Sequence, residues 1–332
     1  MSEKSPCLIE CRKLPDTPDQ SVVYRLLPQN PDDTYYNERI DRNLGWITEE
    51  EQHILHTSTI GIAGCGGMGG LLAERFVRAG IGTIKIADLE EFDATNVNRQ
   101  FAARRDTIGV SKAIATAESL RAISDDFELH VYPQGITDKS VAAFVDGCDL
   151  IFAEIEIFEL EAYVLLHQFA RKAGVDILDG LVVGWGTNLF HYTPNGYRVE
   201  DMLGFTGTDV DARKQIRDLV LRVKGGSADA RTDATNRIVH AFVPNLPTYT
   251  EDGSDRTFVL ERLRHGKASI VAPSPLLATG VAMVRAVLYL FERHGSRRSR
   301  IRPLPKAPGF LAVDLATCAV TCVERERIEH AQ

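Results

Sequence analysis

The sequence has 332 residues, a formal net charge of −8 at pH 7 and 25% charged residues, a composition typical of one large globular domain or two small ones. The acidic balance disfavours broad nucleic-acid binding, which requires a basic face, and no apolar run approaches the roughly 20 residues of a membrane span. Residues 1–14 lack the apolar centre of a signal peptide. We therefore expect a cytoplasmic protein without membrane contact.

The first 35 residues form an extension ahead of the main domain, which we place at residues 36–332. Residues 7–11 and 21–27 are apolar runs, and a turn-rich segment with two prolines separates them. This pattern fits a β-hairpin and an unstructured tail equally well. Further along, Thr48 and Glu51 have the spacing of a capping box, which predicts a helix over residues 49–56.

A glycine-rich turn is the most informative stretch of the chain. It follows the apolar residues 60–63 and precedes a predicted helix over residues 71–79. Backbone N–H groups at a helix N-terminus, together with the helix dipole, favour a phosphate, and glycines let the backbone approach a ligand closely. A tight turn without a ligand is the alternative. The candidate cofactor-binding residues of the turn are Gly64, Gly66, Gly67, Met68 and Gly69.

The segment after the turn supports a nucleotide site. Residues 83–87 read as a second buried strand, which ends at Asp88. Asp88 lies 24 residues after Gly64, near the roughly 20 residues typical of an acid that binds a ribose hydroxyl. Glu90 follows closely and is a further candidate cofactor-binding residue.

The loop over residues 89–101 is dense in polar side chains that can reach phosphate or ribose, among them Asn96, Arg99 and Gln100. Lys112 then opens an amphipathic helix that runs to about residue 123. The first turn of a helix favours acids, so a lysine there fits a bound anion beside it. A lysine on the protein surface is the alternative interpretation.

The remaining pattern predicts the fold. Strands alternate with helices, which indicates an α/β, Rossmann-like, doubly wound and mostly parallel sheet, with antiparallel strands at the C-terminus within residues 310–323. Ligands of such sheets bind beyond the carboxyl ends of the strands, where Gly64, Asp88 and Glu156 are expected. The further strands are predicted at residues 128–132, 149–153, 175–178 and 188–192, and the helices between them at residues 140–145 and 158–173.

Two later segments differ from this alternation. Residues 194–269 are polar and rich in Gly and Asp, with one predicted helix over residues 210–223. We expect a long crossover insertion of functional loops or partly disordered chain there. Residues 275–294 form a helix that is apolar nearly all round, so we expect it in the core or in a subunit interface.

The six cysteines do not predict a metal site. Two close pairs, Cys7 with Cys11 and Cys318 with Cys322, have three residues between them, whereas zinc ribbons use pairs with two. Reduced thiols are the better interpretation for a cytosolic protein, and we do not expect zinc.

Taken together, these residues resemble the family of the molybdopterin- and thiamine-pathway adenylating enzymes MoeB and ThiF, relatives of the ubiquitin-activating enzymes. The resemblance covers roughly residues 36–325 and is weakest over the insertion. The family motifs are matched here by the glycine turn, by Asp88, by Asn96 to Gln100 as N-x-x-R-Q, by Gly109 to Lys112 as G-x-x-K, and by Arg39 and Arg42 as R-x-x-R.

The resemblance implies binding of ATP with Mg²⁺ and attack of a substrate carboxylate on the α-phosphate, which gives an acyl-adenylate and pyrophosphate. In that case Asp88 and Gln100 bind the nucleotide, and Asn96, Arg99 and Lys112 are catalytic. Charge grows on the phosphates during such a transfer, so fixed cations and amides are needed there.

The resemblance also implies a metal ligand and a dimer. The metal-linked Asp of the family falls at Glu156, and Glu154 is the fallback. Arg39 is expected to act in the site of the partner subunit of a homodimer. No cysteine lies between Cys148 and Cys318, so a thioester step like that of the ubiquitin-activating enzymes is not expected.

The substrate stays open at this point. The missing zinc pairs favour a member that activates a carboxylate on a peptide during ribosomal peptide antibiotic maturation, similar to the microcin and pantocin enzymes. A hairpin in the N-terminal extension would then hold a leader peptide by strand addition. The alternatives are activation of a sulfur-carrier protein, ATP-dependent dehydration or cyclisation as in tRNA threonylcarbamoyladenosine dehydratase, a non-catalytic binding partner, and a dehydrogenase.

Overall fold

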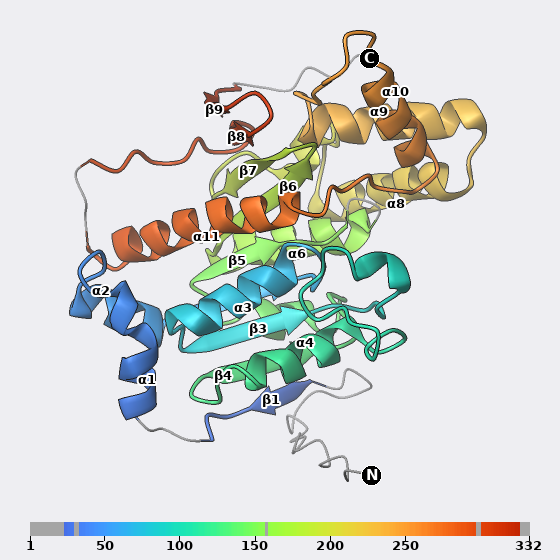
Figure 1. Cartoon of the computed structure of the whole chain (residues 1–332). Coiled ribbons are helices and arrows are strands. Elements are labelled where there is room, and N and C mark those ends of the chain that lie inside the picture. Colours follow the sequence, from blue (N-terminus) through green and yellow to red (C-terminus); the bar gives the residue numbers. More distant parts are fainter. Residues whose placement is uncertain (1–22, 30–32, 157–158, 297–299, 326–332) are drawn as a thin grey trace.

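A mixed sheet runs through the centre of the computed structural model, which describes residues 23–29, 33–156, 159–296 and 300–325 (Figure 1). Within these residues the sheet has nine strands in the order β1-β4-β3-β2-β5-β6-β7-β8-β9. The strands are β1 (Tyr24–Leu26), β2 (Thr59–Ala63), β3 (Thr83–Ala87), β4 (Glu128–Tyr132), β5 (Leu150–Ala153), β6 (Asp176–Val183), β7 (Gly186–Tyr192), β8 (Phe310–Asp314) and β9 (Ala319–Val323).

The predicted fold class is confirmed. Strands β2 to β6 pair in parallel, while β7, β8 and β9 are antiparallel additions at one edge. The parallel strands are almost fully buried and carry apolar runs such as Ile60–Ala63 and Leu150–Ala153, as expected for strands covered on both faces. Their carboxyl ends lie along one edge, and the glycine turn after β2 is there.

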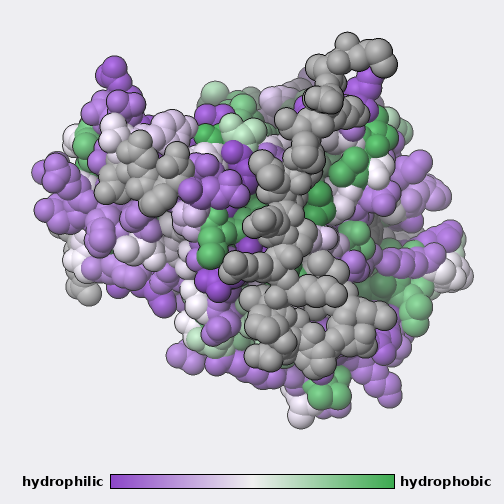
Figure 2. Space-filling model, turned by 90° about the horizontal axis from the view of Figure 1, so that it is seen from below, coloured by the Kyte–Doolittle hydropathy of each residue, from purple (hydrophilic) through white to green (hydrophobic). Residues whose placement is uncertain are grey.

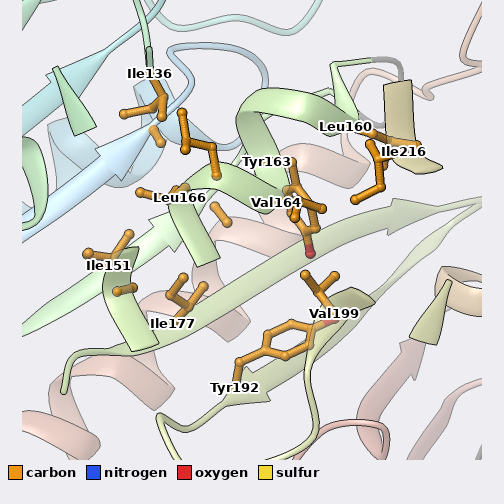
Figure 3. Packing of buried hydrophobic residues seen from close by; sticks show 14 of the residues in the cluster. Ile136, Ile151, Leu160, Tyr163, Val164, Leu166, Ile177, Tyr192, Val199 and Ile216 are labelled. Atoms are coloured by element: carbon orange, nitrogen blue, oxygen red, sulfur yellow. The ribbon is translucent and has the colours of Figure 1, made fainter. Parts of the chain in front are cut away.

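Helices cover both faces of the sheet (Figure 1). One hydrophobic cluster joins one face of the sheet to α3, α4 and α11, and a second joins the other face to α5, α6, α8 and α9 (Figure 3 shows part of the second). The helices are α1 (Asp33–Ile40), α2 (Glu49–Thr57), α3 (Gly69–Ala79), α4 (Lys112–Arg121), α5 (Val141–Val145), α6 (Leu160–Ala173), α7 (Val199–Met202), α8 (Asp209–Gly225), α9 (Ala228–Phe242), α10 (Ser254–Arg264) and α11 (Ser274–Arg293).

Local sequence signals explain several helix ends. The capping box at α2 is present, because the Glu51 N–H donates to Thr48 Oγ1 and the Thr48 N–H donates to Glu51 Oε2. Gly80 ends α3 in the left-handed conformation, at a φ of +86°, where glycine carries no steric penalty.

The expectation for residues 194–269 was wrong. Instead of loops around a single helix, the segment holds α7, α8, α9 and α10. Its apolar residues are few but regularly spaced, so α8 buries Ile216 and Leu219 and α9 buries Ile238 and Phe242 in the second hydrophobic cluster. Figure 3 shows Ile216 of α8 in this cluster together with Leu160 of α6. The insertion is therefore a packed helical layer.

Among the described residues, helix α11 alone has the length and apolar composition to cross a membrane. It contacts β6, β7 and α3 and buries a row of small side chains, Ala278, Ala282 and Ala286. Leu276 and Val284 lie exposed on its outer side. α11 is therefore a core helix that is buried on its inner side and exposes apolar side chains to solvent on its outer side.

The N-terminal strand belongs to the main sheet. β1 pairs antiparallel with β4 and forms the sheet edge. The earlier apolar run, residues 7–11, lies outside the described residues, so the predicted hairpin stays a prediction. In the face that Figure 2 presents, hydrophilic residues predominate and hydrophobic residues form small separate groups.

Candidate functional site

The glycine turn between β2 and α3 is held in a shape that only glycine allows at two positions. Gly64 has a φ of +108°, and a Cβ there would lie 2.2 Å from the Glu154 carbonyl oxygen. A Cβ on Gly69 would lie 1.9 Å from the Gly64 carbonyl oxygen. A Cβ on Gly66, in contrast, would lie 3.9 Å from its nearest neighbour, Gln100 Nε2. The turn is therefore packed tightly at Gly64 and Gly69, and it is open at Gly66, where a ligand would approach.

Asp88 connects the turn to the next loop. Its Oδ2 accepts a hydrogen bond from the Cys65 N–H at 2.7 Å, and its Oδ1 accepts one from the Glu90 N–H at 2.8 Å. Burial raises the pKa of Asp88, while these two N–H groups and Lys112 act in the opposite direction. The carboxylate is thus oriented beside the turn, as a ribose-binding acid requires.

A pocket of about 60 Å³ lies at this edge of the sheet. Its walls come from the glycine turn, the end of β3 and the segment after β5. Among the sequence-predicted residues, it is lined by Gly64, Gly66, Asp88, Glu90, Lys112 and Glu156.

Lys112 is the cation of this pocket. It begins α4, its side chain is only 5% exposed, and its Nζ lies 2.6 Å from Glu90 Oε2. Its own N–H also donates to the Glu90 carbonyl oxygen at 2.8 Å, so the lysine is fixed by both main chain and side chain. Glu90 is the more exposed partner, with 44% of its side chain accessible.

A second, larger pocket of about 210 Å³ opens from the first. The two pockets share Gly66 and the segment Glu154–Glu156. Arg99 and Gln100 line the larger pocket together with Gly67 and Met68. Arg99 Nη1 donates to the Thr95 carbonyl oxygen at 2.8 Å. Arg99 Nε and Gln100 Oε1 are buried without a partner among the described residues, so both have capacity to bind a polar ligand.

The far wall of the larger pocket is apolar. It comes from the helical insertion, chiefly from Ile238, Val239 and Phe242 of α9 and Val259 and Leu263 of α10. A polar end beside the glycine turn and an apolar end under the insertion suit a ligand that continues beyond a nucleotide.

Glu156 lies where the two pockets meet and interacts electrostatically with the other charged residues. Partial burial and the charges of Glu90 and Asp88 raise the pKa of Glu156, while Lys112 and Arg99 lower it. One carboxylate beside a phosphate site fits Mg²⁺, which is commonly held by one or two carboxylates and the substrate phosphates. No group of three or more metal-ligating side chains occurs in the described part of the chain.

Two predicted site residues have other partners. Asn96 does not line either of the two pockets described above, and its Oδ1 caps a short 3₁₀ turn, Ala94–Asn96, by accepting the Asp93 N–H at 3.1 Å. The cap uses the Asn96 oxygen, whereas a phosphate would accept a hydrogen bond from the Asn96 amide N–H₂, so the predicted catalytic role of Asn96 stays a prediction.

Arg39 lies at the opposite end of the sheet. Its guanidinium donates to both carboxylate oxygens of Asp126, at 2.6 and 2.8 Å, and to the Val77 carbonyl oxygen. Asp126 precedes β4 and Val77 is in the last turn of α3, so this ion pair is near the amino ends of the parallel strands. Arg39 cannot reach the pockets of its own chain, and its role in a partner subunit stays a prediction. Arg42, the other arginine of the pair, is exposed.

The sequence interpretation missed one group of residues in the larger pocket. Asp179 of β6 lines it, and Asp179 Oδ2 accepts a hydrogen bond from the Tyr163 hydroxyl at 2.5 Å. The signal was present, because Asp179 is an acid inside an apolar strand sequence, where an ionisable side chain usually has a function.

The cysteines of the described residues take no part in the pockets. Cys65 is buried, and desolvation raises the pKa of its thiol well above the ordinary value. The pKa of the Cys148 thiol is raised to about 12, again by burial. Both are therefore poor nucleophiles. Cys318 and Cys322 are exposed near the β8–β9 hairpin.

Comparison with known proteins decides the family. The model of the ThiF family matches residues 40–307, which is most of the chain. The chain belongs to the ThiF family. The predicted relationship to the MoeB- and ThiF-type proteins is thereby confirmed.

Individual ThiF relatives match shorter segments. The tRNA threonylcarbamoyladenosine dehydratase of Escherichia coli (strain K12) is 34% identical over 125 residues, which is 37% of this chain and 47% of that protein. The sulfur carrier protein ThiS adenylyltransferase of Bacillus subtilis (strain 168) is 28% identical over 168 residues, or 49% of each protein. The chain thus spans about half the length of these curated relatives.

Solved structures of similar fold cover more of the chain. The structure of PaaA has a TM-score of 0.58 at 18% identity and covers 89% of this chain and 84% of that one. The structure of Escherichia coli MccB with ATP has a TM-score of 0.56 at 14% identity and covers 91% and 74%. At these identities the likeness concerns the fold alone.

Proposed function

We propose that this ThiF-family chain is an enzyme that uses ATP to adenylate a carboxylate of a peptide or small protein, in the maturation of a ribosomal peptide natural product. The observation that carries the proposal is the junction of the two pockets at Gly66 and Glu154–Glu156. The smaller pocket has the features of a nucleotide site, and the larger one leads from the expected phosphate position to an apolar surface.

The residues at the junction match the needs of the reaction. A substrate carboxylate oxygen bonds to the α-phosphorus, the bond to the β-phosphate oxygen breaks, and pyrophosphate leaves with the electron pair. Lys112 and Arg99 stabilise the negative charge that grows on the phosphates. Asp88 orients the ribose through its free lone pairs. Glu156 would hold Mg²⁺, which neutralises phosphate charge.

The peptide substrate is supported by the wall of the larger pocket. Side chains from α9 and α10 form an apolar wall against which the apolar side chains of a peptide can pack. The related dehydratases act on tRNA by their names, but the net charge of −8 disfavours that partner here. ATP-dependent dehydration or cyclisation stays the second candidate, since it begins with the same adenylation.

Product analysis tests the proposal. The purified protein is incubated with ATP, Mg²⁺ and a library of short peptides with free carboxylates, and the nucleotide products and ATP–pyrophosphate exchange are measured. We expect AMP, pyrophosphate and peptide-dependent exchange, and none of these with Lys112→Ala. Conversion of ATP to ADP and phosphate would contradict adenylation.

A further inference from the structure

A third pocket lies at the end of the sheet opposite the glycine turn. Its volume is about 380 Å³, more than that of either pocket described above. Asp176 begins β6 and His191 lies near the end of the antiparallel β7, so both mark the amino end of β6. The second half of α11 and residues 301–306, which Figure 1 shows alongside that helix, form the other walls. We call this cavity the α11 pocket.

The α11 pocket is separate from the candidate nucleotide site. None of its residues lines either of the other two pockets. Pro275, in the first turn of α11, borders the larger pocket, whereas Arg285 lines the α11 pocket. Ten residues of helix therefore separate the two positions, which is about 15 Å at the usual rise of an α-helix. A ligand of the α11 pocket would not lie beside a nucleotide at the glycine turn.

Arg285 makes the α11 pocket a candidate anion site. Its guanidinium is held from one side, because Nη2 donates to the Arg302 carbonyl oxygen at 2.8 Å. Its Nε is buried and has no hydrogen-bond partner among the described residues. Burial lowers the pKa of Arg285, and Glu292 and Cys322 act on it electrostatically without a hydrogen bond. Because a partly buried arginine usually has an anionic partner, the free side of this guanidinium indicates a ligand anion.

The acids that line the pocket do not take that place. Asp176 Oδ2 lies 2.7 Å from His191 Nε2, so this carboxylate already has a partner. Glu292 is exposed and forms no ion pair among the described residues. Lys306, also exposed, is a second cation of the pocket that has no ion pair in the described part of the chain. Arg285 and Lys306 are thus both free to bind one anionic group.

The rest of the wall is mostly apolar. It consists of aliphatic side chains and a proline from β6, α11 and the segment after α11, namely Leu178, Leu288, Ile301, Pro303 and Leu304. Leu178 and Leu304 belong to the hydrophobic cluster under α11. The volume is within the range of small-molecule sites, which are mostly apolar with a few polar groups that fix the ligand. An arginine in such a wall suits a carboxylate, which it can bind through two hydrogen bonds.

We propose that the α11 pocket binds a small organic acid, with the carboxylate of the acid on Arg285 and Lys306 and its apolar part against the leucines of the wall. This acid is not the carboxylate that would be adenylated, because the glycine turn lies at the other end of the sheet. The inference goes beyond the proposed function and does not depend on it.

Three probes test the inference on the full-length protein. The ligand 4-phenylbutyrate has an acid group and an apolar body, 4-phenylbutyramide has nearly the same shape without the charge, and inorganic phosphate has the charge without the apolar body. Calorimetry should show that the wild type binds 4-phenylbutyrate at least about tenfold more tightly than the amide, as expected for charge-assisted hydrogen bonds, and at least about tenfold more tightly than phosphate. Saturating α,β-methylene ATP should leave this affinity unchanged.

Variants assign the binding to the α11 pocket. Arg285→Met keeps an unbranched apolar side chain in the wall and should weaken 4-phenylbutyrate binding about tenfold or more. Lys306→Met changes an exposed residue and should weaken it about threefold, so it tests the inference even if Arg285→Met does not fold. Arg217→Met is the matched control, because Arg217 pairs with Glu161 on the surface of α8, and it should bind the probe like the wild type. Thermal melts of each variant check the fold.

Three results would overturn the inference: equal binding of the acid and the amide by the wild type, undiminished binding of 4-phenylbutyrate in both Arg285→Met and Lys306→Met, and displacement of the probe by α,β-methylene ATP. The last result would place the acid at the nucleotide site instead. AMP formation enters none of these measurements, so a failure of the proposed function would leave this test intact.

Discussion

The ammonium of Lys112 lies 2.6 Å from the Glu90 carboxylate at the edge of the smaller pocket. The lysine is nearly buried and the glutamate is half exposed, so Glu90 is the partner that can move. A phosphate placed beside the glycine turn would compete with Glu90 for this cation. The ion pair therefore holds Lys112 in position before the nucleotide arrives.

Replacing Lys112 should abolish turnover while the fold survives. Lys112→Ala removes a charge-assisted contact worth about 2–4 kcal/mol in the transition state, so we expect at least about a 30-fold lower rate of AMP formation. Glu90→Gln is the matched control, since it removes the other charge of the pair and should leave ATP binding as tight or tighter. Near-normal rates for Lys112→Ala would show that the lysine is only a partner of Glu90.

Arg39 should matter for stability. Its guanidinium and Asp126 form an ion pair whose side chains are 10% and 6% exposed, and removal of one partner of a buried pair costs about 3–5 kcal/mol. We expect Arg39→Ala to lower the melting temperature strongly and to leave calorimetric ATP binding unchanged below it. The double variant Arg39→Ala with Asp126→Asn should regain part of the loss.

A role of Arg39 in the site of a partner subunit would give a different experimental result. A homodimer in which Arg39 serves the neighbouring site would make Arg39→Ala inactive but folded. Mixing it with Lys112→Ala chains would then restore activity, because one site of the mixed dimer keeps both residues. Restored activity would contradict the assignment of Arg39 to stability alone.

Asp179 should change the pH dependence of stability. Its pKa is raised from 3.8 to about 7 by burial, so the folded protein holds a proton that the unfolded chain has lost. Its contribution is fully present below about pH 4 and is lost as the pH rises towards 7. Relative to the wild type, Asp179→Asn should therefore be more stable at pH 8 than at pH 5, by up to about 3 kcal/mol, since about two pH units separate pH 5 from the folded pKa. Denaturant melts of both proteins at the two pH values measure this, and an unchanged difference would be evidence against the raised pKa.

The cysteines should be dispensable. Cys65 and Cys148 are buried with raised thiol pKa values, and a thiol of this kind does not supply a nucleophile at neutral pH. Cys65→Ala is expected to retain ATP binding and AMP formation despite its place in the glycine turn. Loss of AMP formation in a variant that still folds and binds ATP would point to a covalent step.

Features that depend on residues close together in the sequence could be predicted, whereas features that depend on contacts between distant segments could not. The glycine turn, Asp88 and Lys112 were predicted because their signal is local: a strand end, a turn and a helix start within 50 residues of chain. Asp179 was missed because its place in the larger pocket and its hydrogen bond with Tyr163 depend on contacts between β6 and distant segments, which no short motif records. Glu154 was considered only as the fallback metal ligand.

One further error has a physical reason. Helix α10 buries none of its side chains, so its sequence has no apolar stripe by which a helix could be predicted. The distance of Arg39 from the pockets of its own chain arises because α2 and β2 separate it from the glycine turn and carry the chain along the full length of a strand. The predicted action of Arg39 in a partner subunit stays a prediction.

Titration calorimetry with ATP plus Mg²⁺ and, separately, with NAD⁺ tests the central claim most directly. The claim is that the pocket of Asp88, Lys112 and the glycine turn is an ATP site of an adenylating enzyme. The account predicts that the wild-type protein binds ATP more tightly than NAD⁺ and that Lys112→Ala weakens ATP binding about tenfold or more. Tighter binding of NAD⁺ than of ATP would contradict it.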